Sequence, residues 1–253
     1  MSKNNDSRRD EIKKYILTKE KVRVEELASM LNVSLETIRS DLSFLENTGL
    51  LYRTHGGATL RNAIVDLPMD IRIKEKAEEK KQIAYKAINF INDDDVIYID
   101  PSSTALPLGR LLRLKKNLTI VTNSFELIPI IAESDHKLII VGGDYLKAGK
   151  RMVGGYATDV IRTIHYDLAI FGMDGCKEIN GPGIMGREEI FLNSEVMKRT
   201  SKSMILSDSS KFDKIGKYQY TTFEEIDIFI TDVLSDEDRK RVNAKTVVEA
   251  MKK

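Results

Sequence analysis

Residues 34–45 have the sequence SLETIRSDLSFL, and this stretch decides how the first part of the chain folds. Ser34 is of the type that caps helices, because its hydroxyl can accept a hydrogen bond from an amide of the first turn. Glu36 complements the positive end of the helix dipole. Apolar side chains then recur every three or four residues: Leu35, Ile38, Leu42 and Leu45. The spacing predicts an amphipathic helix that begins after Ser34 and buries these four side chains.

The flanking segments predict the other parts of a small domain. An earlier helix is indicated by Ile12, Tyr15 and Ile16, and the helix before Ser34 by Val24, Leu27, Met30 and Leu31. Residues 50–53 and 58–60, separated by His55-Gly56-Gly57, predict a hairpin. Two short helices joined by a tight turn and followed by a hairpin are typical of a winged helix-turn-helix, which we expect over residues 1–61. The alternative is a three-helix protein-interaction domain.

The polar face of the helix after Ser34 is the candidate DNA-reading surface. Arg39 can fork onto a guanine edge or a phosphate, and short hydroxyl side chains suit phosphates or bases. The alternative for Arg39 is an ordinary surface charge. The expected DNA-binding residues are Ser34, Glu36, Thr37, Arg39, Ser40 and Ser43, with Arg53, His55 and Gly56 in the wing.

Composition limits the class of protein. The 253 residues carry a net charge of +1, and residues 1–61 carry a net charge of +2, so DNA binding rests on pattern and not on charge. Cys176 is the single cysteine, which favours a reducing cytoplasm over a disulfide framework. The N-terminus has no apolar signal segment, and no apolar run approaches the length of a membrane span. We therefore expect a cytoplasmic protein without a membrane partner.

Beyond a linker expected at residues 62–74, apolar runs alternate with helical stretches through residues 75–253. The expected strands are Val96–Ile99, Leu118–Val121, Leu138–Val141, Leu168–Phe171, Met204–Leu206 and Ile226–Ile230. The expected helices lie near 104–114, 124–133, 156–164 and 188–200. Fully apolar strands that alternate with helices predict an α/β domain with a mostly parallel sheet covered on both faces.

Polar and glycine residues follow these strands, at the edge where doubly wound sheets bind ligands. Hydroxyl side chains and free amides at helix starts suit an anion, Lys211 adds a charge, and Asp100 and Asp208 can accept from sugar hydroxyls. The alternative for each of these residues, taken alone, is an ordinary helix cap or turn residue. The set comprises Asp100, Ser102, Ser103, Thr104, Thr122, Asn123, Ser124, Gly142, Gly143, Asp174, Gly175, Asp208 and Lys211.

The chain resembles the DeoR family of bacterial repressors over nearly its whole length. In the first domain the matching residues are Arg8, Ile12, Ile16, Ser34, Thr37-Ile38-Arg39-Ser40-Asp41-Leu42, Leu45, Gly49, Arg53 and His55-Gly56-Gly57-Ala58. In the second they are the polar set above with Gly172, Glu188, Glu189, Lys198 and Leu206–Phe212. The resemblance implies a repressor of a carbohydrate operon, a fold related to ribose-5-phosphate isomerase and a sugar-phosphate effector, and it adds Glu188 and Lys198 to the effector site.

Two departures from the family pattern bear on specificity. Ser40 stands where the family usually has Arg, Lys or Asn, which puts the operator preference in doubt. Pro101 and Ser102 stand where the family often has Gly or Ala, and Pro101 stiffens the loop and removes an amide donor, so the ligand can differ.

The same residues are compatible with other functions. A sugar-phosphate isomerase would use Asp100, Asp174, Glu188 and Lys211 for acid–base work, but a recognition helix argues against an enzyme. Cys176 and His165 could form a nucleophilic pair only if the fold brought them together. The three histidines are too scattered for a metal site, and no nucleotide-binding motif occurs, so we expect no metal and no cofactor. One recognition helix buries too little surface for an operator, so we expect a homo-oligomer, a dimer or a tetramer.

Overall fold

The computed structural model describes residues 3–19, 21–47, 50–60 and 68–251. The chain divides into two compact units, Met1–Leu67 and Pro68–Lys253, and each is described by itself. The expected linker at 62–74 is therefore too long at its C-terminal end, because residues 68–74 belong to the second unit. There Met69 is buried and its amide donates to the carbonyl of Ala148 over 3.0 Å. Gly49 and residues 61–67 lie outside the described residues.

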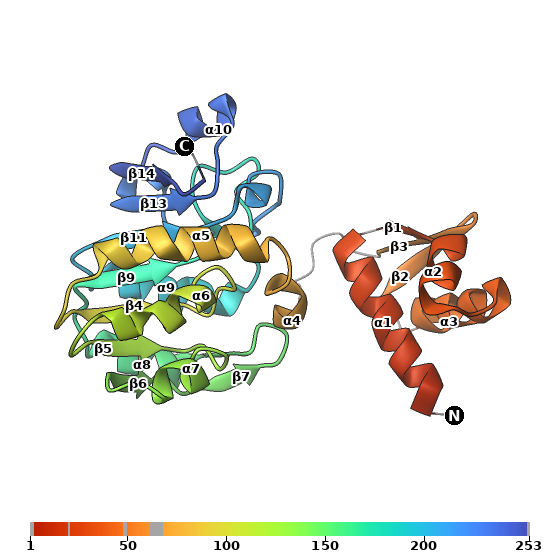
Figure 1. The fold of residues 1–253 in the computed structure, drawn as a ribbon, viewed down its shortest axis with the longest axis horizontal. Coiled ribbons are helices and arrows are strands. Elements are labelled where there is room, and N and C mark those ends of the chain that lie inside the picture. Colours follow the sequence, from red (N-terminus) through yellow and green to blue (C-terminus); the bar gives the residue numbers. More distant parts are fainter. Residues whose placement is uncertain (1–2, 20, 48–49, 61–67, 252–253) are drawn as a thin grey trace. The chain divides into compact units, whose positions relative to one another are not determined.

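Over its described residues the first unit has three helices and a three-stranded antiparallel sheet of order β1-β3-β2 (Figure 1). Its elements are α1 (Lys3–Lys19), β1 (Lys21–Arg23), α2 (Val24–Leu31), α3 (Leu35–Asn47), β2 (Leu51–Thr54) and β3 (Gly57–Leu60). The predicted cap is present, since the Ser34 hydroxyl accepts from the Thr37 amide over 3.1 Å. Strand β1 was not predicted, because three residues are too few to show a period.

The core of this unit contains most of the predicted apolar residues. Ile12, Ile16, Leu27, Ile38, Leu42 and Leu45 are completely buried. Two expectations were wrong: Leu35 is 40% exposed and Met30 is 46% exposed, because each lies at an end of its helix, beyond the core. The hairpin turn consists of His55 and Gly56, and Gly56 has a φ of +83°, a conformation that glycine adopts without strain.

The second unit is a seven-stranded parallel sheet between two helical layers. The sheet order is β14-β13-β11-β9-β4-β5-β6. Its strands are β4 (Val96–Ile99), β5 (Thr119–Thr122), β6 (Lys137–Ile140), β9 (Leu168–Phe171), β11 (Ser203–Leu206), β13 (Ile228–Thr231) and β14 (Thr246–Glu249). The parallel α/β sheet predicted from the sequence is thus confirmed. All six predicted strands are present within one or two residues, whereas β14, a half-exposed edge strand without an apolar run, was not predicted.

Alternate strand residues face opposite layers. Ile97, Ile99 and Ile170 pack with α5 (Ala77–Ala87), α6 (Leu106–Leu111) and α7 (Ile128–Ala132), whereas Tyr98 and Phe171 pack with α8 (Gly155–Arg162) and α9 (Arg187–Met197). Figure 1 shows the two layers on either side of the sheet. The helices α6 and α7 are shorter than expected, since each begins after a turn in which the hydroxyl of Ser102 or Ser124 accepts from the amide three residues on.

Short elements complete the unit. They are α4 (Met69–Arg72), α10 (Asp236–Arg241), the hairpin of β7 (Asp144–Leu146) and β8 (Arg151–Val153), the pair β10 (Gly183–Ile184) and β12 (Tyr218–Gln219), and the 3-10 turns Ile88–Phe90, Leu112–Leu114, Ser209–Lys211 and Phe223–Glu225. Among the described residues, no helix combines the length and the apolar character that crossing a membrane requires.

The chain reverses its direction across the sheet between β6 and β9. From β4 it adds β5 and then β6 on one side, and it returns with β9 on the other side of β4 before adding β11, β13 and β14. The carboxyl ends of β4 and β9 therefore flank the switch point, the position at which open α/β sheets form a ligand crevice.

Asp41 ties two helices of the first unit together. Its carboxylate, 1% exposed, accepts from the guanidinium groups of Arg8 over 2.6 Å and Arg9 over 2.8 Å, both on α1. Removing one member of a buried ion pair costs about 3–5 kcal/mol. Because Arg8 keeps some contact with solvent, we expect Asp41→Ala to lower the opening free energy of α1 and α3 by about 3 kcal/mol, measured by amide hydrogen exchange in the full chain.

The control for this variant is Glu36→Ala, which removes an exposed carboxylate paired with Arg39 on the same helix. This control should leave the exchange of α1 and α3 unchanged, because exposed ion pairs contribute little. Equal protection in the Asp41 and Glu36 variants would contradict a stabilising role for the buried carboxylate.

Candidate functional site

The predicted DNA-reading residues lie on one surface of α3 and the hairpin. The side chains of Glu36, Arg39 and Ser40 are exposed, and those of Thr37 and Ser43 are half-buried. The Arg39 guanidinium lies 3.3 Å from the Glu36 carboxylate, an exposed pair that a phosphate or a base edge can replace. In the turn of the hairpin, His55 and Gly56 are exposed as well.

Arg53 fixes the hairpin against α3. Its guanidinium donates to the Ser43 hydroxyl over 2.8 Å, and its amide donates to the Glu46 carboxylate over 2.8 Å. The Ser43 hydroxyl in turn donates to the carbonyl of Arg39. Two of the predicted DNA-binding residues, Arg53 and Ser43, thus also hold the wing in place beside the recognition helix.

The loops after β4 and β9 are joined by the buried carboxylate of Asp100. It accepts from the amides of Ser102 over 3.0 Å and Gly172 over 2.7 Å. Burial raises the pKa of Asp100, and the two amide donors offset part of this effect. Gly172 is required here, because a Cβ would lie 2.3 Å from the Cβ of Ser102.

Two arginines that the sequence did not reveal line the same crevice. The Arg72 guanidinium lies 3.4 Å from the carboxylate of Asp174, and that of Arg151 lies 2.7 Å from the carboxylate of Glu189. Burial disfavours the charged form of Asp174, but Arg72 and Lys211 outweigh this, so the pKa of Asp174 lies below its ordinary value. These contacts enclose a cavity of only about 20 Å³.

Two buried ammonium groups lie beside this crevice. Lys80, on α5, donates to the Ser103 hydroxyl over 3.0 Å and to the carbonyl of Arg72 over 2.5 Å. Burial lowers its pKa to about 8; Asp208 offsets part of the shift and Lys211 adds to it. Burial also lowers the pKa of Lys211, with a contribution from Lys214. Within the described part of the chain, neither Lys80 nor Lys211 forms an ion pair with a carboxylate.

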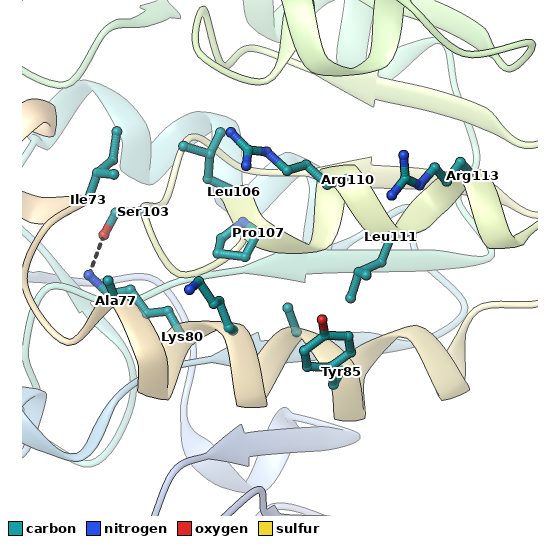
Figure 2. A pocket seen from close by; sticks show the side chains of 12 residues that line it. Ile73, Ala77, Lys80, Tyr85, Ser103, Leu106, Pro107, Arg110, Leu111 and Arg113 are labelled. Atoms are coloured by element: carbon teal, nitrogen blue, oxygen red, sulfur yellow. Dashed lines mark hydrogen bonds between the residues drawn. The ribbon is translucent and has the colours of Figure 1, made fainter.

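A groove of about 350 Å³ opens on the other side of the Ser103 loop, between α5 and α6. Figure 2 shows Lys80 reaching Ser103 at one end, with Tyr85, Pro107 and Leu111 along the groove. The same ammonium group thus contacts both the loop that carries the crevice residues and this open groove.

Several residues predicted for the effector site form hydrogen bonds with other groups of the protein. The Thr122 hydroxyl donates to the carbonyl of Ile99, and the Asn123 amide donates to the carbonyl of Met152 and accepts from the Tyr98 hydroxyl. Ser124 accepts from the Leu127 amide. Side chains whose hydrogen bonds are already made with the protein have less capacity for a ligand.

The remaining predicted residues divide by position. Thr104 and Asp208 are buried at the carboxyl edge, and Asp208 accepts from the Ser210 amide. Gly175 forms an antiparallel β-bridge with Gly183. A Cβ on Gly175 would lie 2.2 Å from the carbonyl oxygen of Lys214. Gly142 and Gly143 are exposed beyond β6.

The structure does not bring Glu188 and Lys198 to the crevice. Glu188 is exposed, and the adjacent Glu189 is the buried residue that faces Arg151, because consecutive helical residues point about 100° apart. Lys198 is exposed at the C-terminal end of α9, before β11 begins, and pairs with Glu195 over 2.8 Å. That end of α9 leads to the amino edge of the sheet, opposite the crevice.

The side chains do not form the alternative sites. Cys176 is buried, which raises the pKa of its thiol to about 11, and its sulfur lies 3.9 Å from the carbonyl of Lys211. His165 is exposed and bonds to Ser201, so the two do not form a nucleophilic pair. No group of His, Cys, Asp and Glu that could hold a metal ion occurs among the described residues.

Comparisons with known proteins agree with this division. Residues 8–63 match the DeoR-like helix-turn-helix domain, and residues 75–233 match the DeoR C-terminal sensor domain. The regulator GolR of Listeria innocua is 33% identical over 84% of each chain, and the L-fucose operon activator of Haemophilus influenzae is 31% identical over 88% of this chain and 91% of its own. The lactose phosphotransferase system repressor of Streptococcus mutans is 27% identical over 96% and 98%.

A solved structure of ribose 5-phosphate isomerase A from Methanocaldococcus jannaschii covers 55% of each chain at 18% identity, with a TM-score of 0.40. This likeness is too distant to bear on activity. The two domain matches together span most of the chain, and each lies within one of its two compact units. The chain belongs to the DeoR family of helix-turn-helix transcriptional regulators.

Proposed function

We propose that this chain is a repressor that binds operator DNA through α3 and the β2–β3 wing, and that a phosphorylated sugar bound at the carboxyl edge of the sensor sheet releases it. The observation that carries the proposal is the pair of buried ammonium groups, Lys80 and Lys211, neither of which has an ion-pair partner among the described residues. Burying a charge without a partner is costly, and a phosphate dianion would compensate both charges.

The same edge of the sheet suits the sugar moiety. Asp208 can accept from hydroxyl groups, and Asp174 is ionised because of Arg72 and Lys211. A carboxylate whose pKa is lowered by neighbouring cations is a weak base, which favours binding over isomerisation of the ligand. The names of two relatives, an L-fucose operon activator and a lactose phosphotransferase system repressor, support a carbohydrate signal and show that the direction of control differs among relatives.

Operator binding requires more than one subunit in this proposal. The exposed face of α3 and the wing is small, and the net charge of +2 over residues 1–61 gives limited attraction to phosphates. Linking two recognition helices in one oligomer raises the effective concentration of the second helix once the first has bound.

Arg39 should provide base recognition. A bidentate contact discriminates by roughly 1–3 kcal/mol, so Arg39→Ala should weaken specific binding roughly ten- to a hundred-fold while the side chain's exposure spares the fold. Arg39→Lys keeps the charge but loses the fork, so it should retain nonspecific DNA binding and lose operator preference. Both constants come from operator and scrambled-DNA titrations at one salt concentration. An operator preference that survives both changes would show that Arg39 is not a reader.

Phosphorylated sugars, and not the free sugars, should release the operator. A panel of hexose, pentose and triose phosphates is titrated against the protein–operator complex, with ligand turnover followed in parallel and none expected. Lys211→Ala should abolish release but leave operator binding intact. Lys198→Ala, which removes an exposed lysine at the opposite edge, is the matched control and should respond as the wild type does. Release by free sugars alone, or by nothing in the panel, would overturn the phosphate assignment.

Ligand affinity should pass through a maximum between about pH 6 and pH 8. Below about pH 6 a phosphate monoester loses its second charge. The pKa of Lys80 is about 8, so above pH 8 its amine has lost the proton. Ligand binding then requires that the amine take up a proton, which lowers the affinity as the pH rises. Lys80→Met should bind more weakly and show no decline that begins near pH 8, as measured by calorimetry in buffers of different ionisation enthalpy. An affinity that stays constant from pH 7 to pH 9.5 would contradict a role for this ammonium group.

A further inference from the structure

Helix α4 is the first element of the sensor unit. It comprises Met69–Arg72 and follows Leu67, the residue at which the first compact unit ends. Helix α4 is therefore the helix of the sensor unit that lies nearest in sequence to the first unit. Residues 68–74 belong to the segment 62–74 that the sequence predicted to be a linker.

One side chain of α4 occupies the ligand crevice. Arg72 is 8% exposed, and its guanidinium lies against Asp174 at 3.4 Å. The cavity that Arg72 encloses with Asp100, Ser102 and Glu189 measures about 20 Å³. That volume holds about one water molecule, whereas ligand sites in proteins span roughly 300–1,000 Å³. This space is too small for a sugar phosphate, and Arg72 is one of the side chains that narrow it.

The rest of α4 is held by residues next to the crevice. The Asp70 carboxylate lies 2.7 Å from the Lys150 ammonium, and Lys150 precedes Arg151, which lines the crevice. On the other side, the carbonyl of Arg72 accepts from Lys80. Helix α4 thus contacts Lys80 directly, and through Lys150 it is linked to the adjacent Arg151. An incoming anion would attract both of these cationic side chains.

We infer that Arg72 couples the effector site to DNA binding: the ligand displaces Arg72 from Asp174, and α4 moves with it. This inference rests on the proposed function. A ligand shifts an equilibrium only through its different affinities for two conformations. A conformation that excludes the ligand is the one that the ligand depopulates. Since the ligand opposes operator binding, the conformation with Arg72 against Asp174 is the one that binds the operator.

The test is operator affinity without any ligand. Arg72→Ala should weaken operator binding by roughly 5- to 150-fold, the usual range of coupling between two sites, and the remaining response to phosphorylated sugars should fall towards none. Asp70→Asn removes the outer attachment without touching the crevice, so it should act in the same direction and guards against a folding defect in the first variant. Arg113→Ala, an exposed arginine on the same unit, is the matched control and should match the wild type.

The outcomes separate this inference from the proposed function. If phosphorylated sugars release the wild type and the Arg72 and Asp70 variants behave identically to it, Arg72 does not couple the sites, although the proposed effector stands. If both variants weaken operator binding and hydrogen exchange over residues 68–74 accelerates, the coupling is supported, even where no sugar phosphate acts and the proposed effector fails. Unchanged operator affinity in both variants overturns the inference in every case.

Discussion

The sensor unit depends on the buried carboxylate of Asp100, which holds together the two loops at the switch point of the sheet. Its two acceptor bonds bring the end of β4 to the amide of Gly172 after β9, strands that are adjacent in space but 72 residues apart at this contact. A buried carboxylate is tolerated only when it is hydrogen-bonded. The bond therefore fixes the spacing of the loops, and the absence of a side chain at Gly172 permits the close approach.

The apolar strands could be predicted from sequence because burial on both faces leaves an unbroken apolar run. The edge strand β14 and the three-residue β1 give no such signal, and neither does the short helix α4. The same limit decides which residues of the candidate site could be predicted. Residues that follow strands, such as Asp100 and Asp174, could be placed at the carboxyl edge by topology alone. Arg72 and Arg151 come from segments without a period, so only the fold reveals them.

Two further residues show where sequence reasoning ends. Lys80 lies in the run Glu78-Glu79-Lys80-Lys81, in which nothing distinguishes a buried lysine from the exposed lysine that follows it. Glu189 and Glu188 are separated by a single step of the helix, and the family pattern that includes both does not say which one faces inward. In each pair the helical phase decides, and the phase follows from packing that the sequence does not display.

The contact between Asp100 and Gly172 also determines when the crevice can form during synthesis, relative to the first unit. All residues of the first unit have been made at Leu67, whereas the crevice cannot form before the chain through Glu189 has been made. At about 5–20 residues per second, translation of the remaining chain takes on the order of 10–40 s. For that interval a nascent chain carries a finished helix α3 and an incomplete sensor domain.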